Sequence, residues 1–305
     1  MNDARNPAGS ASGPAVDPVP LPVVPSIPAV PDFMDLEVPD YAYMFGFIQA
    51  DGHLQPGPGQ KGRLSVEIGF RDLHILEAFA RLTPYYSRIR ERSRDTNFSP
   101  GHRSVVWTLC SLEARTTLNR LGMPYGKKSR DIAPPTAPFS VGAYLRGILD
   151  ADGAVGFTGQ GFPYVALATS STAIARFYAE YAKRITGADR TVARNRRDQV
   201  YNILYCKEEA QALALDLYPA GALCLRRKQE AAESLRHWVR PQGMRKVTRR
   251  RWEDWEDEVL LSGVTLAAAA RQLERSLSSC QLRQWRLRNG IAPAPLPREG
   301  AASGR

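Results

Sequence analysis

The chain has 305 residues, enough for more than one folded domain, and its 41 lysine and arginine residues exceed its 31 aspartate and glutamate residues by ten. This surplus favours a nucleic-acid partner, and because no apolar run approaches the length of a membrane span, an anionic membrane surface ranks well below DNA. The four cysteines show neither metal-ligand spacing nor a disulfide framework, so we expect a cytoplasmic protein. Because the charge favours DNA as the partner, we expect it to be associated with the nucleoid.

Residues 1–38 are rich in proline, alanine and valine and show hardly any periodic pattern. A segment of this composition cannot build a core. We therefore expect a disordered tail before the first folded domain.

An apolar helical segment that ends in Ala-Asp-Gly follows the tail, and a second copy of it occurs later in the chain. The copies are residues 44–52 (MFGFIQADG) and 145–153 (LRGILDADG). Each copy has two small residues four positions apart, which places them on one helical face where another helix can approach closely. These predicted helix-packing residues are Gly46, Ala50, Gly147 and Ala151.

The acid in each copy is expected at the end of its helix. Gly52 and Gly153 suit the left-handed residue that ends many helices, which would bring Asp51 and Asp152 together at two packed helix ends. The helix dipole is negative there, and two neighbouring acids repel each other. Because a cation would remove both objections, the pattern predicts a divalent-metal site, and oxygen-only coordination favours Mg²⁺ over zinc.

This doubled motif resembles the two signature helices of the LAGLIDADG homing endonucleases in their single-chain form, over roughly residues 41–238. The resemblance implies an α+β fold in which a pseudo-twofold pair of αββαββα halves forms a saddle, in a monomer that binds double-stranded DNA. It implies metal-dependent hydrolysis at a long target site, with one motif acid serving each strand. Lys128 and Lys228, near the ends of the two repeats, match the basic residue that lies beside the active site in this family.

The remaining segments of the two halves follow one order of elements. The first half, residues 39–131, is predicted to contain strands at 63–70, 86–94 and 104–110 and helices at 72–82 and 113–121. After a proline-rich linker at 132–139, the second half, residues 140–239, is predicted to contain strands at 162–169, 190–196 and 199–207 and helices at 172–185 and 209–217.

Arginines are frequent on these predicted strands, and strand alternation puts Arg88, Arg90 and Arg92 on one face that suits a DNA groove. The arginines of the two halves predicted to contact DNA are Arg63, Arg88, Arg90, Arg92, Arg94, Arg190, Arg194, Arg196 and Arg197.

A basic linker at 240–250 precedes a third domain at 251–291, and residues 292–305 are predicted to be a second disordered tail. The third domain is predicted to have helices at 252–261, 265–273 and 278–288, with a core of Trp252, Trp255 and Trp285. This pattern resembles the Myb or SANT-like helix-turn-helix domains. The resemblance implies that the last helix is the recognition helix, with Arg283, Arg286 and Arg288 able to reach bases or phosphates.

Two functions remain open at this point. The first is a site-specific double-strand DNA endonuclease to which the helix-turn-helix adds affinity. The second is a non-cutting DNA-binding transcription regulator built on a LAGLIDADG-like scaffold, and an RNA-splicing maturase is a weaker third reading. The presence of both acids and both lysines favours cutting.

Overall fold

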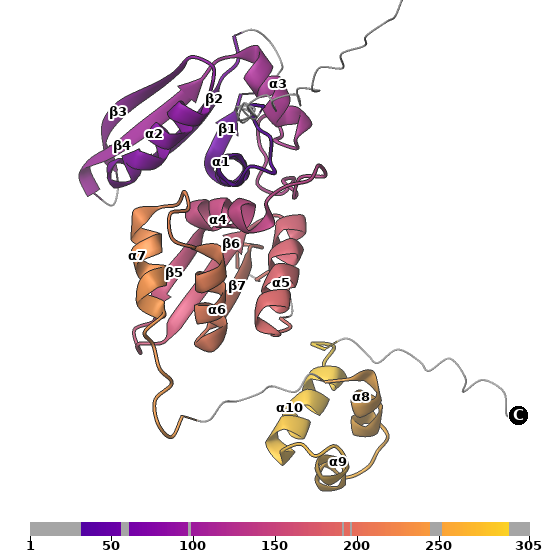
Figure 1. Cartoon of the computed structure of the whole chain (residues 1–305). Coiled ribbons are helices and arrows are strands. Elements are labelled where there is room, and N and C mark those ends of the chain that lie inside the picture. Colours follow the sequence, from indigo (N-terminus) through magenta and orange to yellow (C-terminus); the bar gives the residue numbers. More distant parts are fainter. Residues whose placement is uncertain are drawn as a thin grey trace, which may run out of the picture. The chain divides into compact units, whose positions relative to one another are not determined.

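The computed structural model describes residues 32–55, 61–96, 99–190, 192–195, 197–244 and 252–292. The chain divides into two compact units, residues 1–240 and residues 241–305 (Figure 1). Most of the two predicted tails and of the basic linker lies outside the described residues. The prediction that the first tail reaches residue 38 is wrong for its described end, because Met34 and Leu36 are buried in the core. No described helix is long and apolar enough to cross a membrane.

The first half of the larger unit contains a four-stranded antiparallel sheet with the order β1-β2-β4-β3. Its main elements are α1 (Pro39–Asp51), β1 (Gly52–Leu54), β2 (Leu64–Gly69), α2 (Leu73–Leu82), β3 (Ser87–Thr96), β4 (Ser99–Leu109) and α3 (Leu112–Arg120). One face of the sheet is buried, as in the cross-strand pair of Val66 and Trp107, because apolar residues alternate along the strands.

The second half repeats this plan with a three-stranded antiparallel sheet of order β5-β6-β7. Its elements are α4 (Val141–Asp152), β5 (Gly153–Phe157), β6 (Pro163–Thr169), α5 (Thr172–Thr186), β7 (Tyr201–Cys206), α6 (Glu208–Leu217) and α7 (Arg226–Leu235). The predicted α+β class, with an antiparallel sheet in each half, is confirmed.

The predicted strand at 190–196 is wrong. In its described residues only Arg194 makes a β-bridge, to Tyr201. The backbone N–H of Asp198 bonds to the side chain of Asn195 at 3.0 Å, and that of Val200 bonds to the side chain of Asp198 at 3.2 Å. Such local bonds between side chain and backbone compete with a sheet ladder, so the described part of this half has one strand fewer than the αββαββα pattern.

Buried side chains from both halves form one continuous core that extends from Met34 to Leu235. Helices α1 and α4 pack against each other within it (Figure 1). Helix α1 is buried along its length from Tyr41 to Gln49, so both of its faces meet protein. The shared core makes the two halves a single folded body, since neither half alone would bury a comparable apolar surface.

The described part of the smaller unit contains three short helices, α8 (Asp254–Leu261), α9 (Leu266–Gln272) and α10 (Leu277–Arg288). Thr265 and Ser276 cap α9 and α10, each accepting a hydrogen bond from a backbone N–H in the first turn. Fully buried apolar side chains among its described residues form a cluster of Leu260, Ala269, Leu273 and Cys280.

The predicted tryptophan core of this unit is wrong for two of its three members. Trp255 and Trp285 are 38% and 53% exposed, and only Trp252 packs against the buried cluster. Trp252 lies under the guanidinium of Arg275, 4.0 Å from the ring centroid. Small aliphatic side chains therefore fill a centre that the sequence pattern assigns to aromatic rings.

Candidate active site at the ends of the paired helices

The two motif helices approach so closely that their backbones touch. A Cβ atom at Gly46 would lie 2.3 Å from the carbonyl oxygen of Tyr144, and one at Gly147 would lie 2.2 Å from that of Tyr43. The Ala50 and Ala151 side chains, one turn further on, are half-buried. Only glycine permits this approach, which fixes the ends of the two helices with respect to each other.

The glycines after the two acids do not adopt the predicted left-handed conformation. Gly52 has φ −74° and Gly153 has φ −109°, because the chain leaves each helix directly into a strand. A Cβ at Gly52 would lie 2.6 Å from the carbonyl oxygen of Ile48, and one at Gly153 would lie 2.7 Å from that of Leu149. Steric room, and not a positive φ, is the reason for glycine here.

Asp51 and Asp152 are the last residues of α1 and α4, and both side chains reach solvent. The surrounding protein nevertheless displaces water around them, which raises the pKa of Asp51 above its ordinary value. The same desolvation, followed by the charge of Asp51, raises the pKa of Asp152 to about 6. The two acids therefore stand at the ends of two packed helices, in surroundings that disfavour their charge.

Lys128 and Lys228 are buried and cap the same helix ends. The Lys128 ammonium donates to the carbonyl oxygens of Gln49 and Ala50 in the last turn of α1. The Lys228 ammonium donates to the carbonyl oxygens of Leu149, of Asp150 at 2.9 Å and of Gly153 at 2.7 Å. Burial lowers the pKa of each lysine to about 8, although the charges of Asp51 and Asp152 oppose the shift.

A second layer of side chains, which sequence reasoning did not assign, lies behind the acids. Asp150 is buried and accepts hydrogen bonds from the hydroxyls of Tyr43 at 2.8 Å and Tyr218 at 2.9 Å and from the backbone N–H of Leu225 at 2.6 Å. Both oxygens of its carboxylate are therefore engaged by protein donors. Burial raises the pKa of this carboxyl.

The first half has the matching layer with different chemistry. Gln49 occupies the position of Asp150 and accepts from the hydroxyl of Tyr144 at 2.6 Å, while its amide nitrogen donates to the carbonyls of Gly122 and Ala133. Tyr43 and Tyr144 precede the two motifs at equivalent positions in the sequence. That repetition is a signal that could have pointed to this layer, although it does not reveal the partners across the helix pair.

The two acids border cavities of different size and lining. Asp51 lines one of about 610 Å³, together with three arginines and three further acids: Arg71, Arg103, Arg227, Glu67, Asp72 and Asp150. Asp152 lines one of about 220 Å³, whose lining includes Ser129 and Ser170 and no arginine. The surroundings of the two acids are therefore not equivalent despite the repeated fold.

The donor set suits a metal ion that keeps much of its water. Among the described residues there is no group of three or more His, Cys, Asp or Glu side chains arranged to hold a metal ion. Two carboxylates alone do not suit a zinc site, which takes four protein ligands when structural and three when catalytic. They do fit Mg²⁺, which is commonly held by one or two carboxylates, water and phosphate oxygens.

The predicted DNA-contacting arginines fall into three groups. Arg63, Arg88, Arg90 and Arg92 are exposed in the first half, and the last three lie on the open face of β3. In the second half Arg190 pairs with Glu209, Arg197 pairs with Asp198, and Arg194 donates to the carbonyls of Ser170 and Gln199. The Arg94 side chain and Arg196 lie outside the described residues.

In the smaller unit, Arg283 is held in an ion pair with Asp257, with its Nε 2.8 Å from a carboxylate oxygen. Arg286 and Arg288 are exposed on α10. Of the three arginines predicted for the last helix, these two are the ones that extend into solvent.

A family model described as a LAGLIDADG-like domain matches residues 140–215, the part of the chain that begins with α4 and reaches into α6. No curated protein matches the sequence significantly. Three similar solved structures are meganuclease I-SmaMI bound to uncleaveable DNA, the I-LtrWI LAGLIDADG homing endonuclease bound to target DNA, and mesophilic variants of the homing endonuclease I-DmoI.

Their sequence identities to this chain are 10%, 9% and 14%, and each has a TM-score of 0.43. The alignments cover 64%, 66% and 64% of this chain and 88%, 89% and 97% of the respective structures. The family likeness therefore rests on the domain match and on the repeated motif. Residues 140–215 match the family of LAGLIDADG-like domains, in agreement with the family that the sequence motif resembles.

Proposed function

We propose that this protein is a site-specific, metal-dependent endonuclease of double-stranded DNA that acts as a monomer. The observation that carries the proposal is geometric: Asp51 and Asp152 end α1 and α4, and Lys128 and Lys228 bind the carbonyl oxygens of the same two helix ends. Acids at the negative end of a helix dipole cost stability unless a cation is bound. The family of the second half supports the same reading.

In this proposal the two acids and the two lysines have different roles. Asp51 and Asp152 would hold Mg²⁺, which when bound supplies charge neutralisation at the scissile phosphate and a more acidic water. Lys128 and Lys228 hold the last turns of the two helices through their carbonyls and place positive charge beside the reacting phosphate. All three N–H groups of Lys228 are engaged by carbonyl oxygens, so its contribution is electrostatic and orienting.

The open face of the first sheet supports contact with DNA. Arg88, Arg90 and Arg92 alternate along β3 on that face, and Glu67 partly neutralises it through an ion pair with Arg92 at 2.9 Å. Guanidinium groups along a strand suit phosphates and the edges of guanine. The smaller unit, as a Myb-like helix-turn-helix, would add contacts through Arg286 and Arg288.

The test uses supercoiled plasmids with a randomised insert, incubated with the purified chain and Mg²⁺, after which linear products are recovered by adaptor ligation and sequenced. We expect a recurrent cut sequence for the wild type and none for Asp51→Asn or Asp152→Asn, with DNA binding largely kept by both variants. Asp40→Asn is the matched control, because Asp40 is exposed at the opposite end of α1. That variant should cut like the wild type.

Two outcomes would contradict the proposal. Undiminished cutting by the double variant of Asp51 and Asp152 would show that these acids are not the catalytic pair. A sequence-specific complex that forms equally well with and without Mg²⁺, with no cut product, would instead assign the chain to the non-cutting transcription regulators.

A further inference from the structure

The two lysines of the candidate active site lie on short segments that contact the opposite half of the molecule. We name residues 128–132 the first lysine segment and residues 224–228 the second lysine segment. Each begins or ends with the lysine whose ammonium group caps a motif helix of its own half. What holds these segments in place therefore decides where the lysine charge lies.

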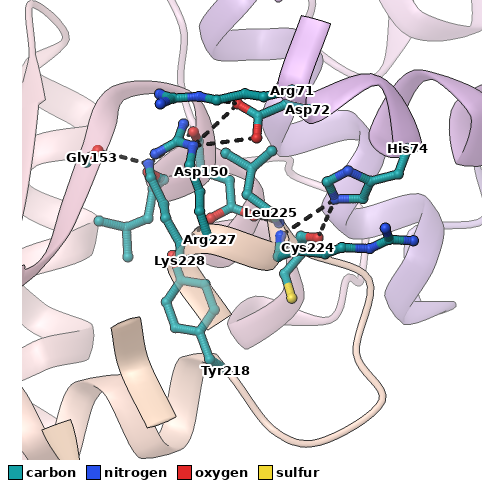
Figure 2. A network of polar contacts seen from close by, with 12 residues as sticks. Arg71, Asp72, His74, Asp150, Gly153, Tyr218, Cys224, Leu225, Arg227 and Lys228 are labelled. Carbon is teal, nitrogen blue, oxygen red and sulfur yellow. Dashed lines mark hydrogen bonds and ion pairs between the residues drawn. The ribbon is translucent and has the colours of Figure 1, made fainter. Parts of the chain in front are cut away.

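The first half holds the second lysine segment through two side chains. The Nε of Arg227 donates to both carboxylate oxygens of Asp72, at 3.3 and 3.2 Å. Nε2 of His74 lies 3.3 Å from the carbonyl oxygen of Cys224 and 3.4 Å from the backbone nitrogen of Arg226. Figure 2 shows Asp72 and His74 reaching the segment on either side of Leu225, with Lys228 extending towards Gly153.

Asp72 is the last residue of the 3-10 turn Phe70–Asp72 and stands directly before α2, and its carboxylate makes no capping hydrogen bond to that helix. It is only 6% exposed and is shared by Arg227 and, at 3.7 Å, by the largely exposed Arg71. A capping aspartate accepts a hydrogen bond from a backbone N–H in the first turn of its own helix. This carboxylate instead binds Arg227, the residue next to Lys228.

The opposite contact exists in the second half. Ser171 occupies the equivalent N-cap position of α5, caps it by accepting from the N–H of Ile174, and donates to the carbonyl oxygen of Ile132 at 2.6 Å. The N–H of Ile132 in turn bonds to the carbonyl oxygen of Lys128 at 3.1 Å. Each half therefore braces the lysine segment of the other, one by an ion pair and the other by a neutral hydrogen bond.

We propose that Asp72 is a positioning residue for Lys228, acting across the two halves through Arg227. The role rests on the proposed endonuclease function. It adds that each half holds in place the lysine of the other half. Weakening the Asp72–Arg227 pair should displace the charge of Lys228 from the end of α4 and leave Lys128 in place. Cleavage of one DNA strand should then slow more than cleavage of the other.

Supercoiled plasmid carrying a target recovered from the wild type provides the measurement, since nicked circles and linear products separate on a gel and end-labelling identifies the strand. Misplacing a catalytic group by a small distance costs about tenfold to a hundredfold in rate. We expect Asp72→Asn and Arg227→Gln to slow the same strand as Lys228→Met by at least about tenfold relative to the other strand, so that nicked circles accumulate.

A double-mutant cycle separates positioning from a general loss of stability. If Asp72 acts through Lys228, the effect of Asp72→Asn on the strand ratio should vanish in the Lys228→Met background, because interacting residues are not additive. The exchanged pair, Asp72→Arg with Arg227→Asp, should restore the wild-type ratio. Additive effects, or equal slowing of both strands, would overturn the proposal.

Two variants serve as matched controls. Arg103→Gln removes a guanidinium from the same cavity, and because Arg103 pairs with Glu91 and not with Asp72, the strand ratio should stay that of the wild type. Ser171→Ala breaks the opposite brace and should shift the ratio towards slower cleavage of the other strand. A shift in the same direction as Asp72→Asn would count against the crosswise arrangement.

Amide hydrogen exchange tests the brace without any cutting. Asp72→Asn should speed exchange at residues 224–228 and leave residues 128–132 unchanged, whereas Ser171→Ala should do the reverse. Unchanged exchange at 224–228 would overturn the brace itself. A wild-type chain that cuts no plasmid would instead overturn the proposed function, so the two failures are distinguishable.

Discussion

At the scale of single residues, the two halves put different chemistry at matching positions. The hydroxyl of Tyr43 donates to the carboxylate of Asp150, whereas that of Tyr144 donates to the amide oxygen of Gln49. Both bonds are buried and both cross between the motif helices. A hydrogen bond to a charged group contributes about 1.5–3 kcal/mol and a neutral one about 0.5–1.5 kcal/mol.

Replacing the two tyrosines therefore gives a matched comparison. Tyr43→Phe should lower the free energy of unfolding by about 1.5–3 kcal/mol and Tyr144→Phe by about 0.5–1.5 kcal/mol, because only the first leaves a buried carboxylate without one of its donors. Urea unfolding at neutral pH measures both. Equal losses would mean that Asp150 is protonated in the folded protein.

The glycines of the helix pair carry a second prediction at this scale. Gly147→Ala should lower the free energy of unfolding by about 1–3 kcal/mol, since its Cβ would meet the backbone of Tyr43 at 2.2 Å. Gly142→Ala on the same helix is the control: its Cβ would meet nothing closer than a hydroxyl at 3.4 Å, and alanine favours a helix by roughly 0.5–1 kcal/mol. Urea unfolding should show opposite signs, and a stable Gly147→Ala variant would refute the close approach.

At the scale of elements, the sequence predicts well those helices and strands that have one apolar face and one polar face. Helix α2 and strand β6 alternate between core and solvent, and their observed bounds lie within one residue of the predicted ones. The segment at 190–196 has strand-like composition, but turns formed by Asn195 and Asp198 prevail there. Strands β1 and β5 are short continuations of the motif helices and leave no periodic signal of their own.

Some residues of the candidate site could likewise be predicted from the sequence, and others could not. The pair of acids and the pair of lysines could be predicted because they recur at matching places in the repeat. The brace between Asp72 and Arg227 could not, because the two residues are 155 positions apart and belong to different halves. A pairing of that kind depends on how two packed helices place their flanking loops, which no local pattern records.

The open faces of the two sheets differ in charge, which leads to a prediction about elements. The first presents Arg88, Arg90 and Arg92, whereas in the second the cross-strand pairs Ala166–Leu204 and Ala168–Asn202 are uncharged. Replacing the three arginines by glutamine should weaken DNA binding and reduce the slope of log K against log salt by about 0.9 for each phosphate that the protein no longer neutralises. Arg120→Gln, an exposed arginine on α3, is the control. An unchanged slope in the triple variant would remove this face from the DNA interface.

At the scale of the whole molecule, the two units have separate cores of very different size. The core of the larger unit extends over both halves, whereas the fully buried cluster of the smaller unit is made of Leu260, Ala269, Leu273 and Cys280. The smaller unit adds buried ion pairs between Glu256 and Arg275 and between Asp257 and Arg283. A small domain with so small an apolar cluster is marginally stable. Because the larger unit has its own core, its stability should not depend on the smaller unit.

Removing residues 241–305 tests this independence together with the proposed role of the third domain. The truncated chain should unfold at the same urea concentration as the larger unit does in the full chain, because its core is intact. It should still cut its target at low salt but bind it far more weakly, because truncation removes the proposed linkage of two DNA-binding modules. The slope of log K against log salt should also be shallower, because the proposed phosphate-binding side chains of the smaller unit are lost. Binding to the target duplex across a salt series provides the measurement, with Arg286→Gln and Arg288→Gln in the full chain as the matched charge-only variant. If truncation and charge removal both left affinity and slope unchanged, the smaller unit would not touch the same DNA, and its exposed Trp255 and Trp285 would direct attention to a protein partner instead.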